Sequence, residues 1–301
     1  MNTKTRKTLR HLTSALLVFA FFALGTGGSV AQQAPSRPTF PAGSTMQRIQ
    51  ASGKIIVGIK IDAPLFGLKN PLNGRVEGFD ADMANLLAKR IFGETEHVEF
   101  IEAPTPTREA LIKAGKVDMI IATYTINRPR SEQVNFGGPY FESQNTIMVT
   151  KENTTFGDSI DGFKSLNGHS VCSTQNGTQY NMIQQEAPKA DLKGFDTIGA
   201  CLTAMRQGRV EAVAAENAIL FGMANAQPGQ YRVLANTDAP PQPYGIGVKK
   251  EDPQFCEWIN SQLQEMFKNG EWAAAYKATL GAIDKNAPRP PTAESMRYCS
   301  R

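Results

Sequence analysis

From Met46 onward, short apolar stretches alternate with amphipathic ones. The pattern predicts strands at residues 54–59, 118–122, 146–151, around 171, 210–214 and 244–249. It predicts helices at residues 80–91, 108–114, from about 178, 202–207, 257–267 and 271–280. Such alternation is typical of α/β folds, in which parallel sheets carry helices on both faces. Ligands of these folds bind at the carboxyl ends of the strands.

The helix at 80–91 illustrates the pattern. Met83, Leu87 and Ile91 recur at helical spacing and predict a buried face. Asp80 stands at the start of the helix, where we expect its side chain to cap the first turn, and Asp82 follows it as a second helix-start residue.

The first 31 residues have the features of a secretory signal peptide. Four basic residues precede an apolar stretch at 12–24, which is too short for a membrane span, and small residues follow at 29–31. We expect cleavage near Ala31 and a flexible, Pro-rich leader at 32–45. No cysteine near Ala31 is available for a lipid anchor, so we expect the protein in the periplasm, with free secretion as the alternative.

Removal of the signal peptide changes the charge. The whole chain has 32 basic and 28 acidic residues, and the four basic residues lost with the signal peptide leave 28 of each. A neutral chain argues against nucleic acid as a partner, because phosphate binding needs clustered Lys and Arg. The remaining length of about 270 residues is enough for two domains.

The four cysteines all lie in the exported part, which predicts two disulfides and leaves three pairings open. Their spacing matches no zinc motif, and His97 and His169 are the only histidines after processing. We therefore expect no metal site and no cofactor.

The segment 123–130, TYTINRPR, carries the most informative chemistry. It places hydroxyl groups and the guanidinium of Arg130 directly after an apolar strand. Because a guanidinium donates two parallel hydrogen bonds to a carboxylate, the segment suits carboxylate binding. An ordinary surface loop that carries arginines is the alternative.

Eight motifs in a fixed order resemble the family-3 solute-binding proteins of ABC transporters, which bind polar amino acids. The motifs, spread over about 46–281, are GKIIVGIK, EGFDADMANLLAKR, GKVDMIIATYTINRPR, NFGGPYFES, LNGHSVCSTQNGT, GRVEAVAAENAIL, PYGIGVKK and NGEW. The resemblance is strongest to glutamate/aspartate-binding and glutamine-binding members. It implies a monomeric, non-enzymatic binding protein that closes on an amino acid and is read by a membrane permease.

The resemblance also implies a two-lobed type II periplasmic-binding-protein (flytrap) fold. Lobe 1 comprises 46–149 plus 247–285, lobe 2 comprises 150–246, and 286–301 form a C-terminal tail. Two hinge strands lie near 149–151 and 244–247. We favour disulfides Cys172–Cys201 and Cys256–Cys299, because each then stays within one half of this architecture.

Three groups of residues are implied to hold the ligand's main chain. Arg130 binds the α-carboxylate, together with the hydroxyl of Thr125 and the backbone of Thr123. Glu216, where the family usually has Asp, holds the α-ammonium. The loop Asn176, Gly177 and Thr178 supplies amide donors at a helix N-terminus, although by itself it also reads as a Gly turn.

The side-chain pocket is implied to contain Lys60, Thr105 and Arg108. Two cations beside Arg130 favour a second carboxylate, which indicates L-glutamate or L-aspartate. Glutamine or asparagine is the alternative, and a pair between Asp62 and Lys60 would favour it. Two further aromatic residues, Phe66 and Tyr124, either flank the ligand or belong to the core.

Two other functions stay open. The fold also hosts enzymes like cyclohexadienyl dehydratase, for which Glu216 and Lys60 are the available acid–base groups. A soluble sensor that presents its ligand to a receptor would use the same closed form.

Overall fold

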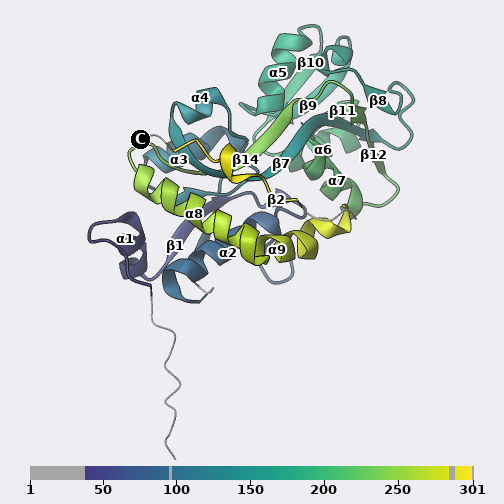
Figure 1. Ribbon diagram of the computed structural model, residues 1–301. Coiled ribbons are helices and arrows are strands. Elements are labelled where there is room, and N and C mark those ends of the chain that lie inside the picture. Colours follow the sequence, from purple (N-terminus) through teal and green to yellow (C-terminus); the bar gives the residue numbers. More distant parts are fainter. Residues whose placement is uncertain (1–37, 95–96, 285–288, 300–301) are drawn as a thin grey trace, which may run out of the picture. The chain divides into compact units, whose positions relative to one another are not determined.

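Two long antiparallel strands, β7 (Val134–Thr150) and β14 (Pro241–Lys249), form the middle of a mixed sheet (Figure 1). The computed structural model describes residues 38–94, 97–284 and 289–299. The predicted signal peptide at 1–31 and the first part of the leader therefore lie outside the described residues.

Parallel strands flank this centre on both sides. The strand order is β10-β9-β11-β7-β14-β6-β1-β5, and β12 (Tyr231–Val233) pairs with the end of β7. One parallel group comprises β1 (Ile55–Ile59), β5 (Val98–Glu102) and β6 (Met119–Ile120). The other comprises β9 (Ser170–Thr174), β10 (Asp191–Phe195) and β11 (Ala212–Glu216). The predicted α/β fold is confirmed.

Strand β7 connects the two groups. Its residues 134–144 pair with β14, whereas 145–149 pair with β11. The change of partner falls between Gln144 and Asn145, about five residues before the lobe boundary expected from the sequence. The lobe boundaries themselves stay a prediction.

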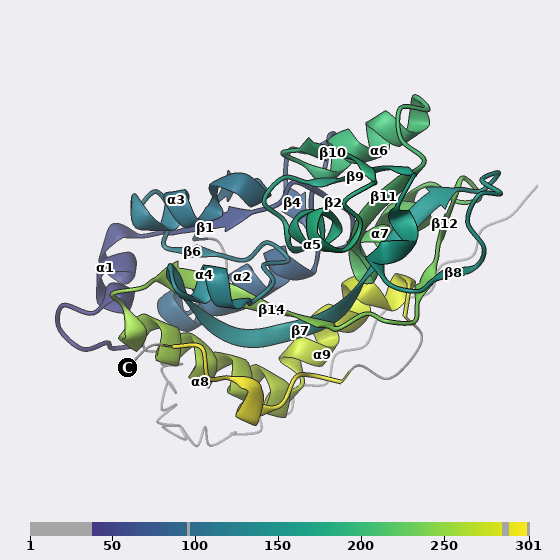
Figure 2. The ribbon, with the colours of Figure 1, turned by 90° about the horizontal axis from the view of Figure 1, so that it is seen from above.

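Helices cover both faces of the sheet (Figure 2). On one face, a single apolar cluster includes residues of α1 (Thr45–Ser52), α2 (Phe79–Phe92), α6 (Ile198–Arg206), α7 (Asn217–Ala226), α8 (Pro253–Asn269) and α9 (Glu271–Thr279). On the other face, α3 (Arg108–Lys113) and α5 (Thr178–Glu186) each pack over one parallel group. A helix with the length and hydropathy of a membrane span does not occur in the part of the chain that the structure describes.

The remaining elements are short. They are a three-stranded sheet of β2 (Asp62–Ala63), β3 (Gly67–Lys69) and β4 (Val76–Glu77), a pair of β8 (Ser159–Ile160) and β13 (Ala235–Asn236), the one-turn helix α4 (Arg128–Ser131), and 3-10 turns at Thr105–Thr107, Phe163–Leu166, Leu280–Ala282 and Ala293–Ser295.

Two local predictions differ from the structure. The strand predicted at 146–151 is the end of β7, which already begins at Val134. Glycine is rare inside strands, but Gly137 lies within β7 because α8 packs closely against it: an added Cβ would come within 2.5 Å of Ile259. Helix α2 begins at Phe79 with Gly78 as its N-cap. The prediction that Asp80 caps this helix is therefore wrong, since its carboxylate is bonded to other parts of the chain.

Two disulfides, Cys172–Cys201 and Cys256–Cys299, connect the elements. They are the pairs favoured from the sequence. The first joins β9 to α6, and the second fixes the C-terminal segment 289–299 to α8. The segment is mostly irregular, and Tyr298 forms a β-bridge with Phe136.

We expect the double substitution Cys172→Ala/Cys201→Ala to lower the free energy of unfolding by about 3 to 4 kcal/mol, because the closed loop of 29 residues restricts the unfolded chain. Cys256→Ala/Cys299→Ala, with a loop of 43, should lose a similar amount. Reversible denaturation measures both. Peptide mapping without reduction that finds another pairing would contradict the assignment.

Candidate functional site

Eleven residues from both parallel groups meet around one small cavity at the carboxyl ends of the strands. They are Lys60, Thr105, Arg108, Thr123, Thr125, Arg130, Thr174, Gly177, Thr178, Gln179 and Glu216. Lys60 follows β1, Thr174 ends β9 and Glu216 ends β11. This is the position at which open α/β sheets bind ligands.

The cavity is nearly closed. Its volume is about 20 Å³, which is room for about one water molecule. One wall is formed by the segments that follow β1, β5 and β6, and the other by the segments at the ends of β9, β10 and β11. Three hydrogen bonds join the two walls, at the cavity or beside it. Thr125 Oγ1 donates to Glu216 Oε1 (3.0 Å), Asn127 Nδ2 donates to Thr178 Oγ1 (3.4 Å), and the amide of Gly199 donates to Asp62 Oδ2 (2.8 Å). A ligand of amino-acid size therefore enters only if the walls move apart.

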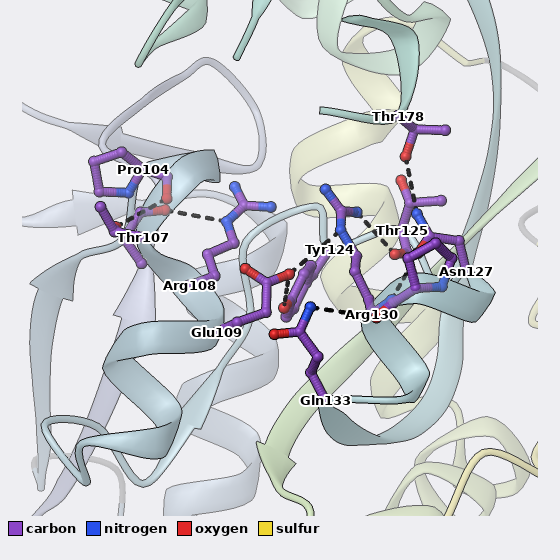
Figure 3. A network of polar contacts seen from close by, with 12 residues as sticks. Pro104, Thr107, Arg108, Glu109, Tyr124, Thr125, Asn127, Arg130, Gln133 and Thr178 are labelled. Atoms are coloured by element: carbon purple, nitrogen blue, oxygen red, sulfur yellow. Dashed lines mark hydrogen bonds and ion pairs between the residues drawn. The ribbon is translucent and has the colours of Figure 1, made fainter. Parts of the chain in front are cut away.

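Arg130 lies on one wall with a fixed orientation. Its Nη1 donates to the carbonyl of Thr125 (2.9 Å), and its Nε lies 3.6 Å from Oε1 of Glu109 (Figure 3). Asn127 caps the short helix α4 by accepting from the amide of Arg130 (3.1 Å). The guanidinium is thus held in place by groups of the protein itself.

Arg108 is fully buried on the same wall. Its Nε donates to the carbonyl of Ala103 (3.2 Å), but its Nη2 has no hydrogen-bond partner among the described residues. Burial lowers the pKa of Arg108, and the nearby Arg130 lowers it further. A buried charged donor without an acceptor is costly, so this nitrogen is suited to an incoming anion.

Tyr124 lies close to both of these arginines. Its ring centroid lies 5.2 Å from the guanidinium carbon of Arg108 and 5.0 Å from that of Arg130, and its hydroxyl donates to Glu109 Oε1 (2.7 Å) (Figure 3). Burial raises the pKa of Tyr124 far above its usual value, so the hydroxyl stays a donor. Tyr124 is not among the residues that line the cavity and belongs to a buried apolar cluster, which agrees with the second of the two alternatives that the sequence left open for it.

Lys60 is the third cation at the cavity, with 8 % of its surface exposed. Burial is the main cause that lowers the pKa of its ammonium; Arg108 lowers it further, and Asp62, Glu216 and Asp80 raise it. No hydrogen bond or ion pair of this ammonium is found within the described ranges. The expected alternative, a pair with Asp62, does not form, because Asp62 accepts from Gly199 instead.

The opposite wall is the loop that leads into α5. Gly177 is the N-cap of α5 and leaves no room for a side chain, since a Cβ would lie 2.8 Å from the carbonyl oxygen of Thr174. Asn176 is exposed, has a φ of 57° and does not line the cavity. Its side chain therefore does not contribute to the cavity in this structure, and the role of its loop in ligand binding stays a prediction.

Two lining residues were not predicted. Thr174 is the last residue of β9, and Gln179 lies in the first turn of α5, where its Nε2 donates to Asn145 Oδ1 (2.6 Å). The rule that strand ends line the site was sufficient to find Thr174. The aromatic residue Phe66 belongs to the core, where it packs edge-on against Phe79 and Phe141.

Across residues 38–94, 97–284 and 289–299, no cluster of three or more His, Cys, Asp or Glu side chains is arranged to hold a metal ion. The chemistry of the cavity is that of three cations, one carboxylate and several hydroxyl and amide groups. It suits the binding of a small anionic or zwitterionic molecule.

Comparison with known proteins identifies relatives of this chain. It is 37% identical over 229 residues to the glutamine-binding protein of Geobacillus stearothermophilus, covering 76% of this chain and 85% of that protein. It is 36% identical over 239 residues to the glutamate-binding protein GluB of Corynebacterium glutamicum, covering 76% and 79%.

A solved structure of an ancestral arginine-binding protein bound to glutamine superposes with a TM-score of 0.69 at 33% identity, covering 76% of this chain and 98% of that one. The fold is thus the two-lobed type II fold. Residues 55–282 match the bacterial extracellular solute-binding proteins, family 3, and the chain belongs to this family.

Proposed function

We propose that this protein binds an acidic L-amino acid, glutamate or aspartate, in the periplasm and delivers it to the permease of an ABC transporter. The family and the glutamate- and glutamine-binding relatives support amino-acid transport. The excess of cations at the cavity supports an acidic side chain.

That excess is the observation on which the proposal rests. Three cations, Lys60, Arg108 and Arg130, face the cavity against one carboxylate, Glu216. A zwitterionic ligand matches Arg130 with its α-carboxylate and Glu216 with its α-ammonium. Lys60 and the partnerless Nη2 of Arg108 then remain, and a second carboxylate supplies acceptors for both.

Glutamine is the second candidate, because one of the compared proteins is a glutamine-binding protein and the compared solved structure is bound to glutamine. Its side-chain carbonyl can accept from Lys60 or Arg108, but its amide nitrogen donates only. Beside two cations such a donor lacks an acceptor unless it turns to Thr105 or Thr174. The lining therefore favours the carboxylate.

An enzymatic role lacks support at the cavity. Dehydration of a small carboxylate needs an acid or base beside the reacting carbon. Of the titratable groups at the cavity, Glu216 is hydrogen-bonded to Thr125 and Lys60 lies among the cations. We therefore propose a binding protein without enzymatic activity. Turnover of prephenate- or arogenate-type substrates would contradict this. A sensor that presents its ligand to a receptor instead of a permease would bind the same ligand.

Calorimetric titration of the refolded, ligand-stripped protein with Glu, Asp, Gln and Asn tests the proposal. We expect tight binding of Glu or Asp and binding of Gln and Asn weaker by at least tenfold, because a charge-assisted hydrogen bond contributes about 1.5 to 3 kcal/mol. Preference for Gln would keep the family function and overturn the role given to the cations. No binding of any of the four would overturn an amino-acid ligand of this kind.

Arg130→Ala should weaken the binding of every amino-acid ligand by about 2 to 5 kcal/mol, because it leaves the α-carboxylate without its main partner. Arg128→Ala is the matched control: it removes an exposed arginine of the same helix α4, whose side chain pairs with Glu132. Equal affinities for the two variants would exclude Arg130 from ligand binding.

Lys60→Gln should weaken glutamate binding by about 1.5 to 3 kcal/mol and change glutamine binding by less than about 1 kcal/mol, because only the acidic side chain loses a charged donor. Lys69→Gln, at an exposed position of β3, is the control and should change neither. Equal losses for both ligands would show that Lys60 does not contact the side chain.

A further inference from the structure

The carboxylate of Asp80 lies immediately behind the cavity wall and is fully buried. Its Oδ2 accepts from the backbone amide of Thr123 (2.8 Å), and its Oδ1 accepts from the hydroxyl of Tyr140 (2.6 Å). Thr123 lines the cavity with a φ of 47°, which is unusual for a β-branched residue. Asp80 thus touches the wall from behind without lining it.

The backbone fixes this position. Gly78 has a φ of 129°, and a Cβ there would lie 2.4 Å from the carbonyl oxygen of Phe66. Because the backbone at Gly78 comes this close to Phe66, the amide of Phe79 donates to the carbonyl of Leu65 (2.8 Å), and the amide of Asp80 donates to the carbonyl of Phe66 (3.0 Å). The first turn of α2 is therefore held against the segment between β2 and β3, and the carboxylate has little freedom to move.

Charged and titratable groups face Asp80 from four elements. Lys60 lies after β1 and Arg108 lies on α3, and both favour its ionised form. Tyr140 on β7 and Tyr244 on β14 are buried, which raises the pKa of both phenols, so they stay protonated. Burial raises the pKa of Asp80 itself to about 6.

We propose that Asp80 is a specificity-determining residue, whose negative charge offsets part of the positive charge of Lys60 and Arg108 and so sets the preference for an acidic over an amide side chain. This inference rests on the proposed function. The carboxylate of a bound glutamate and that of Asp80 draw on the same two cations and repel each other. A glutamine side chain has no charge and does not compete.

The proposal predicts a proton linkage. A bound glutamate disfavours the ionised form of Asp80, so its pKa rises further in that complex and proton uptake accompanies binding. Below the shifted pKa the repulsion is lost, so the preference for glutamate increases as the pH falls from 8 toward 5. Titration of Asp80 can also affect Thr123, whose amide it accepts from. Such an effect acts on the main-chain contacts, which glutamate and glutamine share, so it cancels in the ratio of their affinities.

The test measures the affinities of glutamate and glutamine from pH 5 to pH 8 in the wild type, Asp80→Asn and Asp82→Asn. In the wild type we expect the ratio of glutamate to glutamine affinity to rise about tenfold toward low pH, as for a pKa difference of about one unit. In Asp80→Asn the ratio should be high and nearly independent of pH. Asp82→Asn, a half-buried carboxylate of the same helix turn, should behave as the wild type.

A pH profile in Asp80→Asn equal to that of the wild type would overturn the inference and assign the titration to another group such as Lys60. Should Asp80→Asn fail to fold, carbon NMR of the wild-type Asp80 carboxylate gives its pKa in each complex. Equal values with glutamate and glutamine would also overturn it. Failure of the proposed function is distinct, because then neither ligand binds, or glutamine binds more tightly than glutamate at every pH.

Discussion

Two buried guanidinium groups lie 5.2 and 5.0 Å from the centroid of one tyrosine ring, and much of the site serves to stabilise this arrangement. Arg108 and Arg130 repel each other in a poorly solvated environment, and this repulsion adds to burial in lowering the pKa of Arg108. The ring of Tyr124 lies close to both and attracts both through its π-system. Its hydroxyl is oriented by Glu109, which also lies beside Arg130. Without this tyrosine, the two cations would lack their common partner.

The repulsion between these cations also explains where the carboxylates of the site lie, some at the cavity and some behind its wall. Three cations face the cavity, and one carboxylate, Glu216, faces it with them. Two further carboxylates, Asp80 and Glu109, lie behind the wall and are engaged by Thr123, Tyr140 and Tyr124. The buried network as a whole is close to neutral, whereas the surface presented to a ligand is cationic. The fold can therefore be stable while the cavity still attracts an anion.

The sequence predicts those parts of the site that follow strand ends. Lys60 and Glu216 follow or end parallel strands, and the strand pattern places them at one edge. Arg130 was singled out in the same way, in the segment directly after the apolar strand at 118–122, and it lies at the same cavity. Local rules are sufficient here because the chain itself carries each residue to the carboxyl end of the sheet.

The remaining features depend on contacts between distant segments. Asp80 looks like a helix cap from its neighbours, but its partners Thr123 and Tyr140 are 43 and 60 residues away. Asn176 lies in the glycine-containing loop that the family resemblance assigns to the site, and its left-handed backbone and exposed side chain are visible only in the folded structure. In the sequence, Gly137, Gly138 and Pro139 indicate a break within what is the continuous strand β7. The glycine at 137 is explained by the proximity of α8, which the sequence does not reveal.

Closure of the cavity and selectivity follow from the same geometry. Thr125 and Glu216 come from different walls and bond to each other at 3.0 Å, so a ligand ammonium that reaches Glu216 must share or replace that bond. The contact between Asp62 and Gly199 lies outside the cavity lining and has no need of a ligand. The two walls are therefore joined partly by contacts outside the cavity. Under the proposed function, discrimination between ligands comes from the cations and from the carboxylate behind them. Lys60, Arg108 and Asp80 all belong to the wall built on β1, α2 and α3, so these charges stay together when the walls move apart.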